Sequence, residues 1–424
     1  MISNNKFNNE IWTMTTLFIV SQLSKLIKNI LILSFFLSLG LGCIEDIEVE
    51  LWGTCYSIET TTFLNFSYQD DSDYPPLYGE IPPEIGQLVN MTDLYLGGNE
   101  LTVIPLEIGN LVNLQSLYLY DNQFTSIPSE IENLTNLRTL DIAFNQISYI
   151  PNELFSLSNL EELYLYGNNL TGQIPLSISN LTNLKFLSLG ENSLTGQIPD
   201  EITNLENLVG IDLAYNNLSG EISQNIGNLV SLEMLNLYQN NLTGQIPDEI
   251  TNLQNLKAID LSYNNFSGEI PYDIGNLINL EYLALFYNNL NGEIPSSIGN
   301  LVNLNLLVLG ENQLSGQIPY EICNINTNSI IENSDIEYVF NGNSFCPPFP
   351  DCIEDYVGFQ YECIDCSDII GDNNNDNVID ILDIVFTINC ILAQSCDSCS
   401  DMNSDGTINI QDIILMINQV LDNP

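Results

Sequence analysis

A segment of 23 or 24 residues recurs along most of this chain and constrains its fold more than any other feature. The unit follows the pattern L-x-x-L-x-L-x-x-N-x-L-x-G-x-I-P-x-x-I-x-N-L-x-N. A single unit is too small to bury its own apolar residues, whereas a stack of units builds a continuous core. The central asparagine of each unit marks the register: Asn99, Asn122, Asn145, Asn168, Asn192, Asn216, Asn240, Asn264, Asn288 and Asn312.

The Leu-x-Leu step of each unit predicts a short strand, because side chains alternate between the faces of a strand and both leucines then point into the core. Later apolar residues, such as Ile178, Leu181 and Leu184, return to the same core. Each central asparagine can hydrogen-bond backbone groups where a strand ends. Stacked units therefore predict a parallel sheet about 45–50 Å long.

A Gly-x-Ile-Pro segment closes most units, as at Gly172–Pro175 and Gly268–Pro271. In this the chain resembles plant-type leucine-rich-repeat proteins, and the resemblance implies an α/β solenoid with a curved parallel sheet. The units that follow Leu101, Phe124 and Ile147 lack the glycine and are one residue shorter. We expect the convex side to be built differently in those units.

The two ends of the repeat array, at residues 77–346, need caps to cover their apolar faces. Residues 43–76 form the predicted N-terminal cap, with a Cys43–Cys55 disulfide and a degenerate half-repeat at Leu64–Phe66.

The predicted C-terminal cap contains a pair formed by Cys323 and Cys346. A last irregular strand is expected at Tyr338–Phe340, with Asn343 following it in the repeat pattern.

Residues 1–42 contain a basic region followed by the apolar run Ile30–Leu41. This order predicts a secretory signal peptide. An uncleaved anchor beginning near Leu26 is an alternative, although the run is short for a membrane span. A lipidated Cys43 is another alternative, although Gly40 stands where that cleavage motif prefers leucine.

Acidic residues outnumber basic residues by 55 to 6, which gives a formal net charge of −49. Half of the basic residues fall within residues 1–42, which leaves Arg138, Lys185 and Lys257. Such a surface repels nucleic acids and anionic membranes, so both are excluded as partners. Solubility is the plain explanation of this charge, and attraction of calcium is the more specific one.

The cysteines avoid the repeat array and cluster in the caps and the tail. An even number of cysteines in a secreted chain predicts disulfides. Two Cys-x-x-Cys pairs leave zinc binding as the alternative, which a signal peptide disfavours. The ten cysteines are Cys43, Cys55, Cys323, Cys346, Cys352, Cys363, Cys366, Cys390, Cys396 and Cys399.

The chain contains no histidine, which excludes histidine-based general bases, nucleophile pairs and metal sites. A pair of carboxylates remains possible, because glycosidases need only two. Asp141 and Glu162 fall on neighbouring predicted strands, about 8 Å apart. An open sheet offers no pocket to raise the pKa of either group, so we predict that the protein is not an enzyme.

The outward positions of the predicted strands are rich in aromatic and acidic residues. Strands favour aromatic residues in any case, so packing preference is one explanation. The other is a binding strip, in which flat rings stack on sugars or anchor peptide side chains and carboxylates accept hydrogen bonds. Tyr215, Tyr263 and Tyr287 also point outward. The predicted binding strip consists of Tyr95, Tyr118, Tyr120, Asp141, Tyr164, Tyr166, Asp212, Tyr238, Asp260 and Phe286.

Near the end of the chain a twelve-residue pattern occurs twice, 29 positions apart. Its oxygen-bearing side chains stand at positions 1, 3, 5, 9 and 12, as a Ca²⁺-binding loop requires. Apolar helices are predicted after the loops at Ile384–Leu392 and Ile413–Leu421. Position 12 is Asp, where EF-hands carry Glu, and no convincing helix enters either loop. The predicted ligands are Asp372, Asn374, Asp376, Val378, Asp380 and Asp383 in the first loop and Asp401, Asn403, Asp405, Thr407, Asn409 and Asp412 in the second.

These features resemble a type I dockerin over Asp368–Asp422. The resemblance implies two bound Ca²⁺ ions, a cohesin-like partner and an extracellular, prokaryotic setting. In that family loop positions 10 and 11 contact cohesin, and they match Ile381 and Leu382 in the first loop and Ile410 and Gln411 in the second. The family often has Ser-Thr there, so this chain departs from the pattern. Packing of Ile381 and Leu382 against the other helix is the alternative role.

The sequence thus predicts a secreted or surface-attached, non-enzymatic binding protein. Its repeats recognise a protein or polysaccharide, residues 347–366 form a linker, and residues 367–424 form a small all-α dockerin-like domain that attaches to a cohesin-like partner. Two alternatives remain open. The protein is an accessory subunit of an extracellular polysaccharide-degrading assembly, or a structural surface protein with a calcium-stabilised tail.

Overall fold

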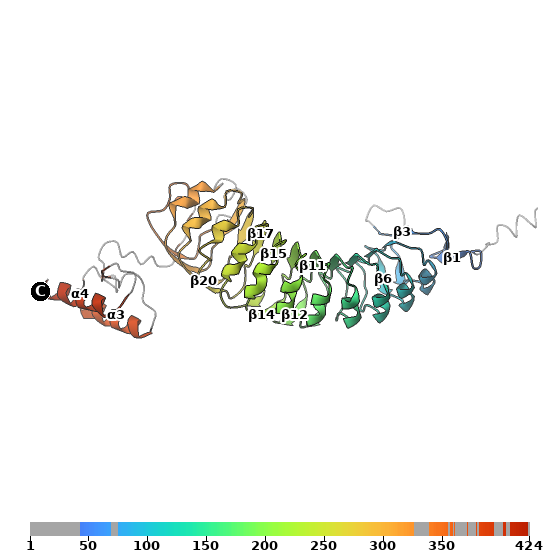
Figure 1. Cartoon of the computed structure of the whole chain (residues 1–424), viewed down its shortest axis with the longest axis horizontal. Coiled ribbons are helices and arrows are strands. Elements are labelled where there is room, and N and C mark those ends of the chain that lie inside the picture. The colour runs from blue at the N-terminus through green and yellow to red at the C-terminus, as the bar shows by residue number, and fades with distance from the viewer. Residues whose placement is uncertain are drawn as a thin grey trace, which may run out of the picture.

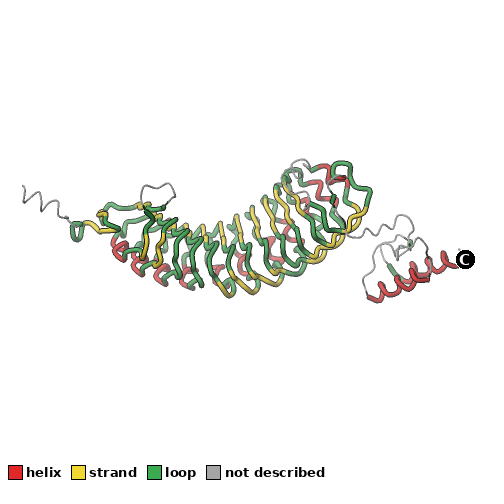
Figure 2. Tube along the Cα trace, turned by 180° about the vertical axis from the view of Figure 1, so that it is seen from behind, coloured by secondary structure: helices red, strands yellow, loops and turns green. Residues whose placement is uncertain are grey.

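The repeats wind into a curved coil in which one turn corresponds to one sequence unit (Figures 1 and 2). Among the described residues, no helix is both long and apolar enough to cross a membrane. The predicted signal peptide, residues 1–42, lies outside the described part. The computed structural model describes residues 43–68, 75–325, 339–354, 357–358, 360, 371, 379, 381–393, 402–403 and 408–422.

The Leu-x-Leu steps form one parallel sheet whose strands follow each other in chain order. This confirms the α/β solenoid, and in Figure 1 the labelled strands of this sheet lie along the inner side of the curve. Its eleven described strands are β3 (Phe63–Asn65), β5 (Asp93–Tyr95), β7 (Ser116–Tyr118), β8 (Thr139–Asp141), β9 (Glu162–Tyr164), β11 (Phe186–Ser188), β13 (Gly210–Asp212), β15 (Met234–Asn236), β17 (Ala258–Asp260), β19 (Tyr282–Ala284) and β21 (Leu306–Val308).

Short 3₁₀ helices gather along the opposite side of the coil (Figure 2). A proline precedes nine of them, because its fixed φ suits the extended residue before the first turn. They are η1 (Pro83–Gln87), η2 (Leu106–Asn110), η3 (Ser129–Asn133), η4 (Asn152–Ser156), η5 (Leu176–Asn180), η6 (Asp200–Asn204), η7 (Gln224–Asn228), η8 (Asp248–Asn252), η9 (Ile274–Asn276), η10 (Ser296–Asn300) and η11 (Tyr320–Asn324).

A second set of strands lies beside the first wherever the unit contains its glycine. Gly172 and Gly196 adopt φ values of 81° and 80°, a conformation that glycine tolerates without strain. The units at Phe124 and Ile147 lack both the glycine and this strand, as expected. The unit at Leu101 also lacks the glycine but forms the strand Glu100–Val103, so the expectation is wrong there. The set comprises β4 (Tyr78–Glu80), β6 (Glu100–Val103), β10 (Thr171–Gly172), β12 (Ser193–Gly196), β14 (Asn217–Gly220), β16 (Asn241–Leu242), β18 (Ser267–Gly268), β20 (Asn289–Gly292), β22 (Gln313–Gln317) and β23 (Ser344–Cys346).

The predicted asparagine ladder is confirmed. Asn216 is 7% exposed; its Nδ2 donates to the carbonyl of Leu189 at 3.0 Å and its Oδ1 accepts from the N–H of Leu194 at 2.9 Å. Each amide therefore joins consecutive turns of the coil. Asn343, which is fully buried, adds a further rung by accepting from the N–H of Leu314 at 3.0 Å.

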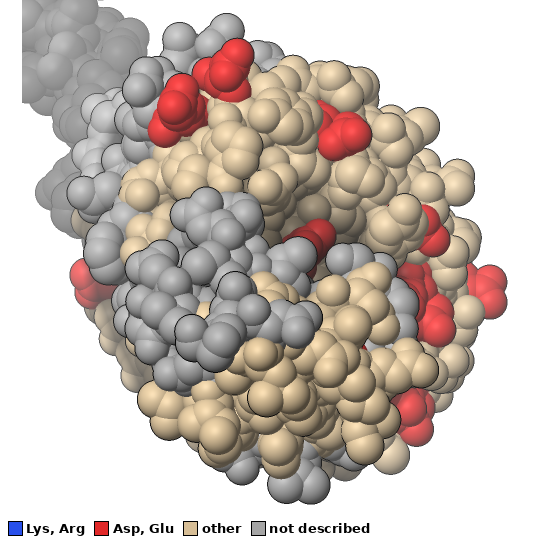
Figure 3. All heavy atoms as spheres, turned by 90° about the vertical axis from the view of Figure 1, so that its left-hand side faces the viewer, with Lys and Arg blue, Asp and Glu red and all other residues tan. Residues whose placement is uncertain are grey.

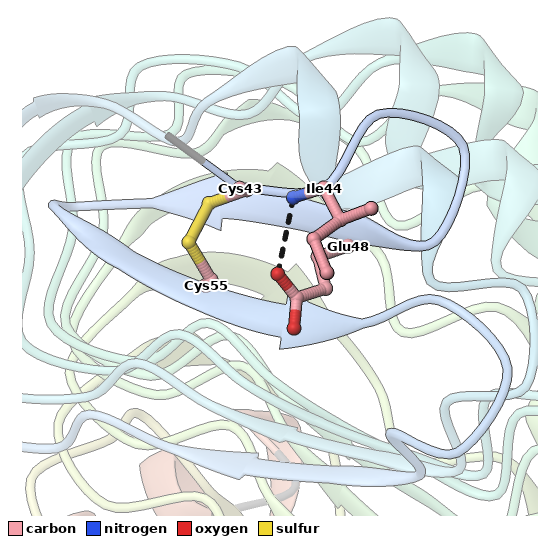
Figure 4. Close-up of a disulfide and its surroundings, with 4 residues drawn as sticks. All are labelled: Cys43, Ile44, Glu48 and Cys55. Carbon is pink, nitrogen blue, oxygen red and sulfur yellow. Dashed lines mark hydrogen bonds between the residues drawn. A yellow bond between two sulfur atoms is a disulfide. The ribbon is translucent and has the colours of Figure 1, made fainter. Parts of the chain in front are cut away.

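The N-terminal cap is a hairpin of β1 (Glu48–Leu51) and β2 (Thr54–Ser57) joined by the predicted disulfide between Cys43 and Cys55 (Figure 4). The N–H of Ile44 donates to the carboxylate of Glu48 at 3.1 Å and closes the turn before β1. The half-repeat at Leu64 forms β3, the first strand of the parallel sheet.

The C-terminal cap differs from the prediction in its disulfide. Cys323 pairs with Cys352, with 5.8 Å between the Cα atoms, and not with Cys346. Cys346 ends β23 and pairs with Gln317 of β22 in the second set of strands, whereas Cys323 lies on η11. Cys346 is itself disulfide-bonded. Of the expected last strand, Tyr338 lies outside the described residues, and Val339 and Phe340 lie in a turn and a bend. The N–H of Leu309 donates to the carbonyl of Val339 at 2.9 Å and continues the ladder there.

Two α-helices follow near the end of the chain, α3 (Ile381–Ala393) and α4 (Ile410–Asp422). Both begin three residues earlier than predicted, because positions 10 to 12 of each loop already form the first helical turn. Asp383 and Asp412 therefore stand in that first turn, where a carboxylate is favoured by the helix dipole.

Candidate functional site

The predicted binding strip occupies the outer face of the parallel sheet and the turns that follow it. Tyr120, Tyr166, Tyr238 and Phe286 stand two residues beyond their strands. The remaining members belong to one row of residues that are paired directly from strand to strand: Tyr95, Tyr118, Asp141, Tyr164, Ser188, Asp212, Asn236 and Asp260.

Aromatic rings meet near the N-terminal end of this strip. The rings of Tyr95 and Tyr118 stack with centroids 4.7 Å apart, and Phe63 lies 5.5 Å from Tyr95. The strand register brings these side chains together, because Tyr95 is paired directly with Tyr118 and is the diagonal neighbour of Phe63, two residues from its direct partner Asp93.

A larger group, which we call the C-terminal aromatic patch, consists of Tyr215, Tyr238, Tyr263 and Tyr287. Ring centroids lie 4.9 Å apart for Tyr215 and Tyr238, 5.3 Å for Tyr238 and Tyr263, and 5.1 Å for Tyr263 and Tyr287. Tyr215, Tyr263 and Tyr287 are 43%, 38% and 56% exposed. The predicted member Phe286 is only 8% exposed and packs against Tyr263, so it supports the patch from beneath.

The predicted strip thus left out three tyrosines that present the most ring surface in this region. Tyr215, Tyr263 and Tyr287 each stand directly before a ladder asparagine and have φ of 52° to 55°. The tight turn into the ladder turns these side chains outward, and their constant place in the unit is the sequence signal that identifies them.

Glycines make room for other rings of the strip. A methyl group on Gly190 would lie 2.8 Å from Cδ2 of Tyr166 and 3.1 Å from Oδ2 of Asp212. Because such contacts are too close, Gly190 is what allows the Tyr166 ring and the Asp212 carboxylate to flank the same backbone.

The three aspartates of the strip share one local structure. Asp141, Asp212 and Asp260 each accept a hydrogen bond from the backbone N–H two residues later, at 3.0, 3.2 and 3.0 Å. Burial raises the pKa of all three carboxyl groups above the ordinary value. Each carboxylate therefore helps to build its turn while remaining partly withdrawn from water.

Neutral donors complete the surroundings of Asp212 and Asp260. Asp212 accepts from Oγ of Ser188 at 3.2 Å and from Nδ2 of Asn236 at 3.0 Å. Asp260 accepts from the hydroxyl of Tyr282 at 3.1 Å. These contacts hold the carboxylates in place without balancing their charge.

Asp141 and Glu162 lie on neighbouring strands, as predicted. Asp141 is paired with Tyr164, and Glu162 with Thr139, so the two acids occupy diagonal positions two residues apart in register. The expectation that an open sheet leaves the pKa of Asp141 unchanged is wrong, since burial raises it and Glu162 adds to the rise. Burial, and then the negative charges of Glu162 and Asp141, raise the pKa of Tyr164 to about 12, so its hydroxyl stays neutral.

Basic side chains lie at the other end of the strands. Arg138 and Lys185 contact Glu161 at 2.7 and 2.6 Å, and Lys257 contacts Glu233 at 2.7 Å. Within the described part of the chain, every Lys and Arg is thus held in an ion pair before the start of a strand. Figure 3 shows acidic side chains and no basic ones on the face that it presents.

Position 12 of each predicted calcium loop is fully buried. Asp383 and Asp412 are both 0% exposed. The Asp412 carboxylate accepts from the N–H of Asn403 at 3.4 Å and of Asn409 at 2.9 Å, which brings loop positions 3, 9 and 12 together. The other predicted ligands lie outside the described residues: Asp372, Asn374, Asp376, Val378, Asp380, Asp401, Asp405 and Thr407.

The part of the sequence that contains these two buried carboxylates has no basic residue. No Lys, Arg or His follows Lys257 in the chain. A buried charge is costly unless it is paired or bound to a metal. The chemistry of Asp383 and Asp412 therefore fits a bound cation, and their oxygen atoms suit Ca²⁺.

Helices α3 and α4 pack through equivalent positions of the two loop repeats. Thr387 and Met416, 29 residues apart, are both 0% exposed, and Thr387 Oγ1 lies 3.3 Å from Met416 Sδ. Ile381, Leu382 and Ile410 are 69%, 59% and 70% exposed. The alternative that Ile381 and Leu382 pack against the other helix is therefore wrong.

This exposed surface is duplicated. Val385 and Ile414, also 29 residues apart, are 49% and 51% exposed, and Gln411 is exposed beside Ile410. Each helix thus presents a similar apolar stripe at the position where its loop ends.

Three sequence families match the chain. The leucine-rich repeat region family matches residues 106–224, and the leucine rich repeat family matches residues 231–253, 255–277 and 279–301. The dockerin type I domain family matches residues 370–421. No curated protein matches the chain in sequence.

Several solved structures share the fold. A TDR receptor is 32% identical with a TM-score of 0.61, over 68% of this chain and 50% of that one. The plant peptide hormone receptor RGFR1, in complex with RGF2, is 34% identical with a TM-score of 0.53, over 68% and 54%. A leucine-rich-repeat protein of Leptospira interrogans, LIC12759, is 35% identical with a TM-score of 0.53, over 68% and 76%. The chain spans about half the length of the two receptors.

Proposed function

This chain belongs to the leucine-rich-repeat family and carries a type I dockerin domain, and on that premise we propose that it is an extracellular, non-catalytic binding protein. The concave face binds a protein or a polysaccharide. The dockerin domain holds two Ca²⁺ ions and attaches the protein to a cohesin-like partner.

The observation that carries the calcium assignment is the pair of buried carboxylates in a region without basic residues. Asp383 and Asp412 are related by the loop repeat and are equally buried. The predicted ligands of each loop would hold one ion, which supplies the missing positive charge and joins the loop to its helix. Because the loop cannot close without this charge, ion binding contributes directly to folding of the domain.

Calorimetry on the full chain tests the number of ions. We expect two calcium sites in the original protein and one in either Asp383→Ala or Asp412→Ala. Retention of both sites in either variant would remove that residue from the ligand set.

The exposed stripes on α3 and α4 support the docking assignment. A cohesin-like partner that covers Ile381 and Leu382 buries apolar area, which favours binding by up to a few kcal/mol. The second stripe, at Ile410 and Gln411, presents an equivalent surface.

Capture of a cohesin domain tests this surface. The double variant Ile381→Asp with Leu382→Asp is expected to lose capture while calcium uptake persists. Val230→Asp with Val302→Asp provides a matched control, since both valines are exposed on the solenoid at 57% and 60%. Unchanged capture by the first variant would place docking elsewhere.

The C-terminal aromatic patch supports the assignment of the concave face to ligand binding. Exposed aromatic rings that contact each other are common at the centre of binding surfaces. RGFR1, which shares this fold, is seen in complex with RGF2, and this precedent favours a protein or peptide ligand.

Screening of glycan and peptide arrays tests the class of ligand. Tyr215→Ala with Tyr263→Ala should abolish binding to whichever array responds, whereas Tyr78→Ala with Tyr272→Ala, at two exposed tyrosines outside the strip, should not. Plant cell-wall glycans as the ligands would favour the second candidate, an accessory subunit of a polysaccharide-degrading assembly.

A further inference from the structure

A pair of identical units repeats on the concave face with a period of two strands. Asp212 ends β13 and Tyr215 follows three residues later, while Asp260 ends β17 and is followed in the same way by Tyr263. On the strand between them, β15, the last residue is the neutral Asn236. Each unit thus combines a carboxylate with an exposed ring, and an uncharged unit separates the two.

The negative charge of these units is not balanced within the described part of the chain. The hydrogen bonds that Asp212 and Asp260 receive come from neutral donors. Lys185 and Lys257 precede β11 and β17 and are held by Glu161 and Glu233 at the ends of the strands opposite to the two aspartates. Burial raises the pKa of both aspartates, so the charged carboxylates gain from any cation that approaches.

The rings beside the carboxylates add a second attraction for a cation. Tyr215 and Tyr263 are 43% and 38% exposed, and Tyr238 bridges them at 4.9 and 5.3 Å. Guanidinium and ammonium groups bind both carboxylates and the faces of aromatic rings. An anionic ligand would be repelled by the same surface, and a neutral glycan would leave the two charges unbalanced.

The spacing of the units restricts the shape of a cationic ligand. Two strand spacings separate Asp212 from Asp260, which is about 10 Å. In a polyproline II helix, residues i and i+3 point to the same side and lie about 9 Å apart. In an extended strand, residues on one side are about 7 or 13 Å apart. The polyproline geometry therefore matches the two units better, and aromatic grooves commonly receive such segments.

Resting on the proposed function of the concave face, we propose that its ligand is a proline-rich cationic peptide segment with basic side chains three residues apart. One basic side chain occupies the unit of Asp212 and Tyr215, and the other occupies the unit of Asp260 and Tyr263. The C-terminal aromatic patch packs against the proline residues that separate the two basic side chains.

Calorimetry with a defined probe tests this proposal. The probe is the blocked peptide Pro-Pro-Arg-Pro-Pro-Arg-Pro-Pro, titrated into the full calcium-loaded chain at physiological ionic strength. Two comparison peptides replace both arginines by neutral citrulline or place the arginines side by side. We expect the probe to bind about tenfold or more tightly than either comparison peptide, since both units must be filled at once.

A matched pair of variants separates this site from the general negative charge of the protein. Asp212→Asn with Asp260→Asn should weaken probe binding about tenfold or more. Asp200→Asn with Asp248→Asn removes the same charge at the same two-repeat spacing, from exposed positions on η6 and η8, and should change the affinity less than about twofold. Equal losses in the two variants, or equal affinity for the three peptides, would overturn the proposal.

A different result would overturn the ligand class while keeping the binding face. If array ligands lacking basic residues bind the chain and lose affinity in Tyr215→Ala with Tyr263→Ala, the concave face binds, but its ligand is not cationic. If no array ligand depends on these tyrosines and the probe does not distinguish the aspartate variants, both this inference and the proposed role of the concave face fail.

Discussion

The repeat array and the C-terminal helix pair both bury one polar side chain at a fixed register, but the two side chains differ in chemistry. The array buries the amide of asparagine, and the helix pair buries the carboxylate of aspartate. An amide carries both donors and an acceptor, so Asn216 bonds carbonyls and an N–H of its neighbours within the chain. A carboxylate such as Asp412 only accepts and leaves a charge behind.

This difference separates a domain whose buried polar groups bond to each other from a domain whose buried carboxylates call for a cation. The ladder of amides leaves no buried charge, so the array needs nothing beyond its own turns and caps. The helix pair buries two carboxylates and has no basic residue, so on the proposed function its folding depends on an ion. The concave aspartates are an intermediate case, because neutral donors hold them but nothing cancels their charge.

Removal of calcium should produce the largest effect and should confine it to one domain. With a chelator, hydrogen exchange in peptides covering α3 and α4 should rise to the rate of an unfolded chain, because two buried carboxylates that lose their cation cost several kcal/mol. Exchange in the ladder strands should stay slow, as measured by mass spectrometry. Persistent protection of both helices without calcium would show that the comparison is wrong.

Loss of one rung of the ladder should have the next largest effect. Asn216→Leu removes the side-chain acceptor of the Leu194 N–H and one of the two amide donors to the Leu189 carbonyl. We expect this loss to lower the free energy of unfolding by about 1–3 kcal/mol. Asn217→Leu, at the exposed neighbouring position, should cost little. Equal shifts of the two variants in urea denaturation would mean that the amide does not act as described.

Neutralising a concave aspartate should stabilise the solenoid and weaken its proposed ligand binding. The pKa of Asp260 is raised in the folded state, so the folded chain binds the proton more tightly and stability falls as pH rises above 3.8. Asp260→Asn should therefore raise the melting temperature at pH 7, and its advantage should shrink as the pH falls toward 3.8. Asn retains an oxygen for the N–H of Ser262.

Calorimetric scans across this pH range provide the measurement, with exposed Asp248→Asn as the charge control. A lower melting temperature for Asp260→Asn at neutral pH would indicate that hydrogen bonding to the carboxylate outweighs its burial.

The exposed ion pairs of the array should contribute least. The hydrogen bond from Lys185 is the main cause that lowers the pKa of Glu161, followed by the charge of Lys185 and the contact with Arg138. The stabilisation is present above pH 4.5 and is lost as pH falls through the lowered pKa. Glu161→Gln should cost at most about 1 kcal/mol in urea denaturation at low salt, and salt should remove the difference. A cost that persists at high salt would point to packing instead.

The repetition of one unit made the array predictable. A period of 23 or 24 residues places every Leu-x-Leu step on the neighbouring one, so strand pairing, the inward leucines and the Asn216 rung follow from local alternation and stacking. The two loop repeats of the dockerin domain were predictable for a related reason, since the spacing of oxygen-bearing side chains within twelve residues is a local property. Asp383 and Asp412, at position 12, are buried, and their role as calcium ligands stays a prediction.

Features that depend on distant parts of the chain could not be predicted from the repeat pattern. Cys323 pairs with Cys352 because Cys346 continues the second set of strands, and only the path of the cap decides between them. Phe286 and Tyr287 are adjacent and both aromatic, yet one is 8% exposed and the other 56%. Neighbouring turns decide which ring is covered.

The sequence alone therefore determined the solenoid, its register, the outward row of the sheet and the place of the dockerin domain, because each arises from spacing within one unit or between identical units. Only the tertiary structure decided which carboxylates are withdrawn from water, which tyrosines form a continuous patch and that Ile381 and Leu382 face solvent. Burial and charge balance depend on side chains far away in sequence, and no repeat pattern encodes them.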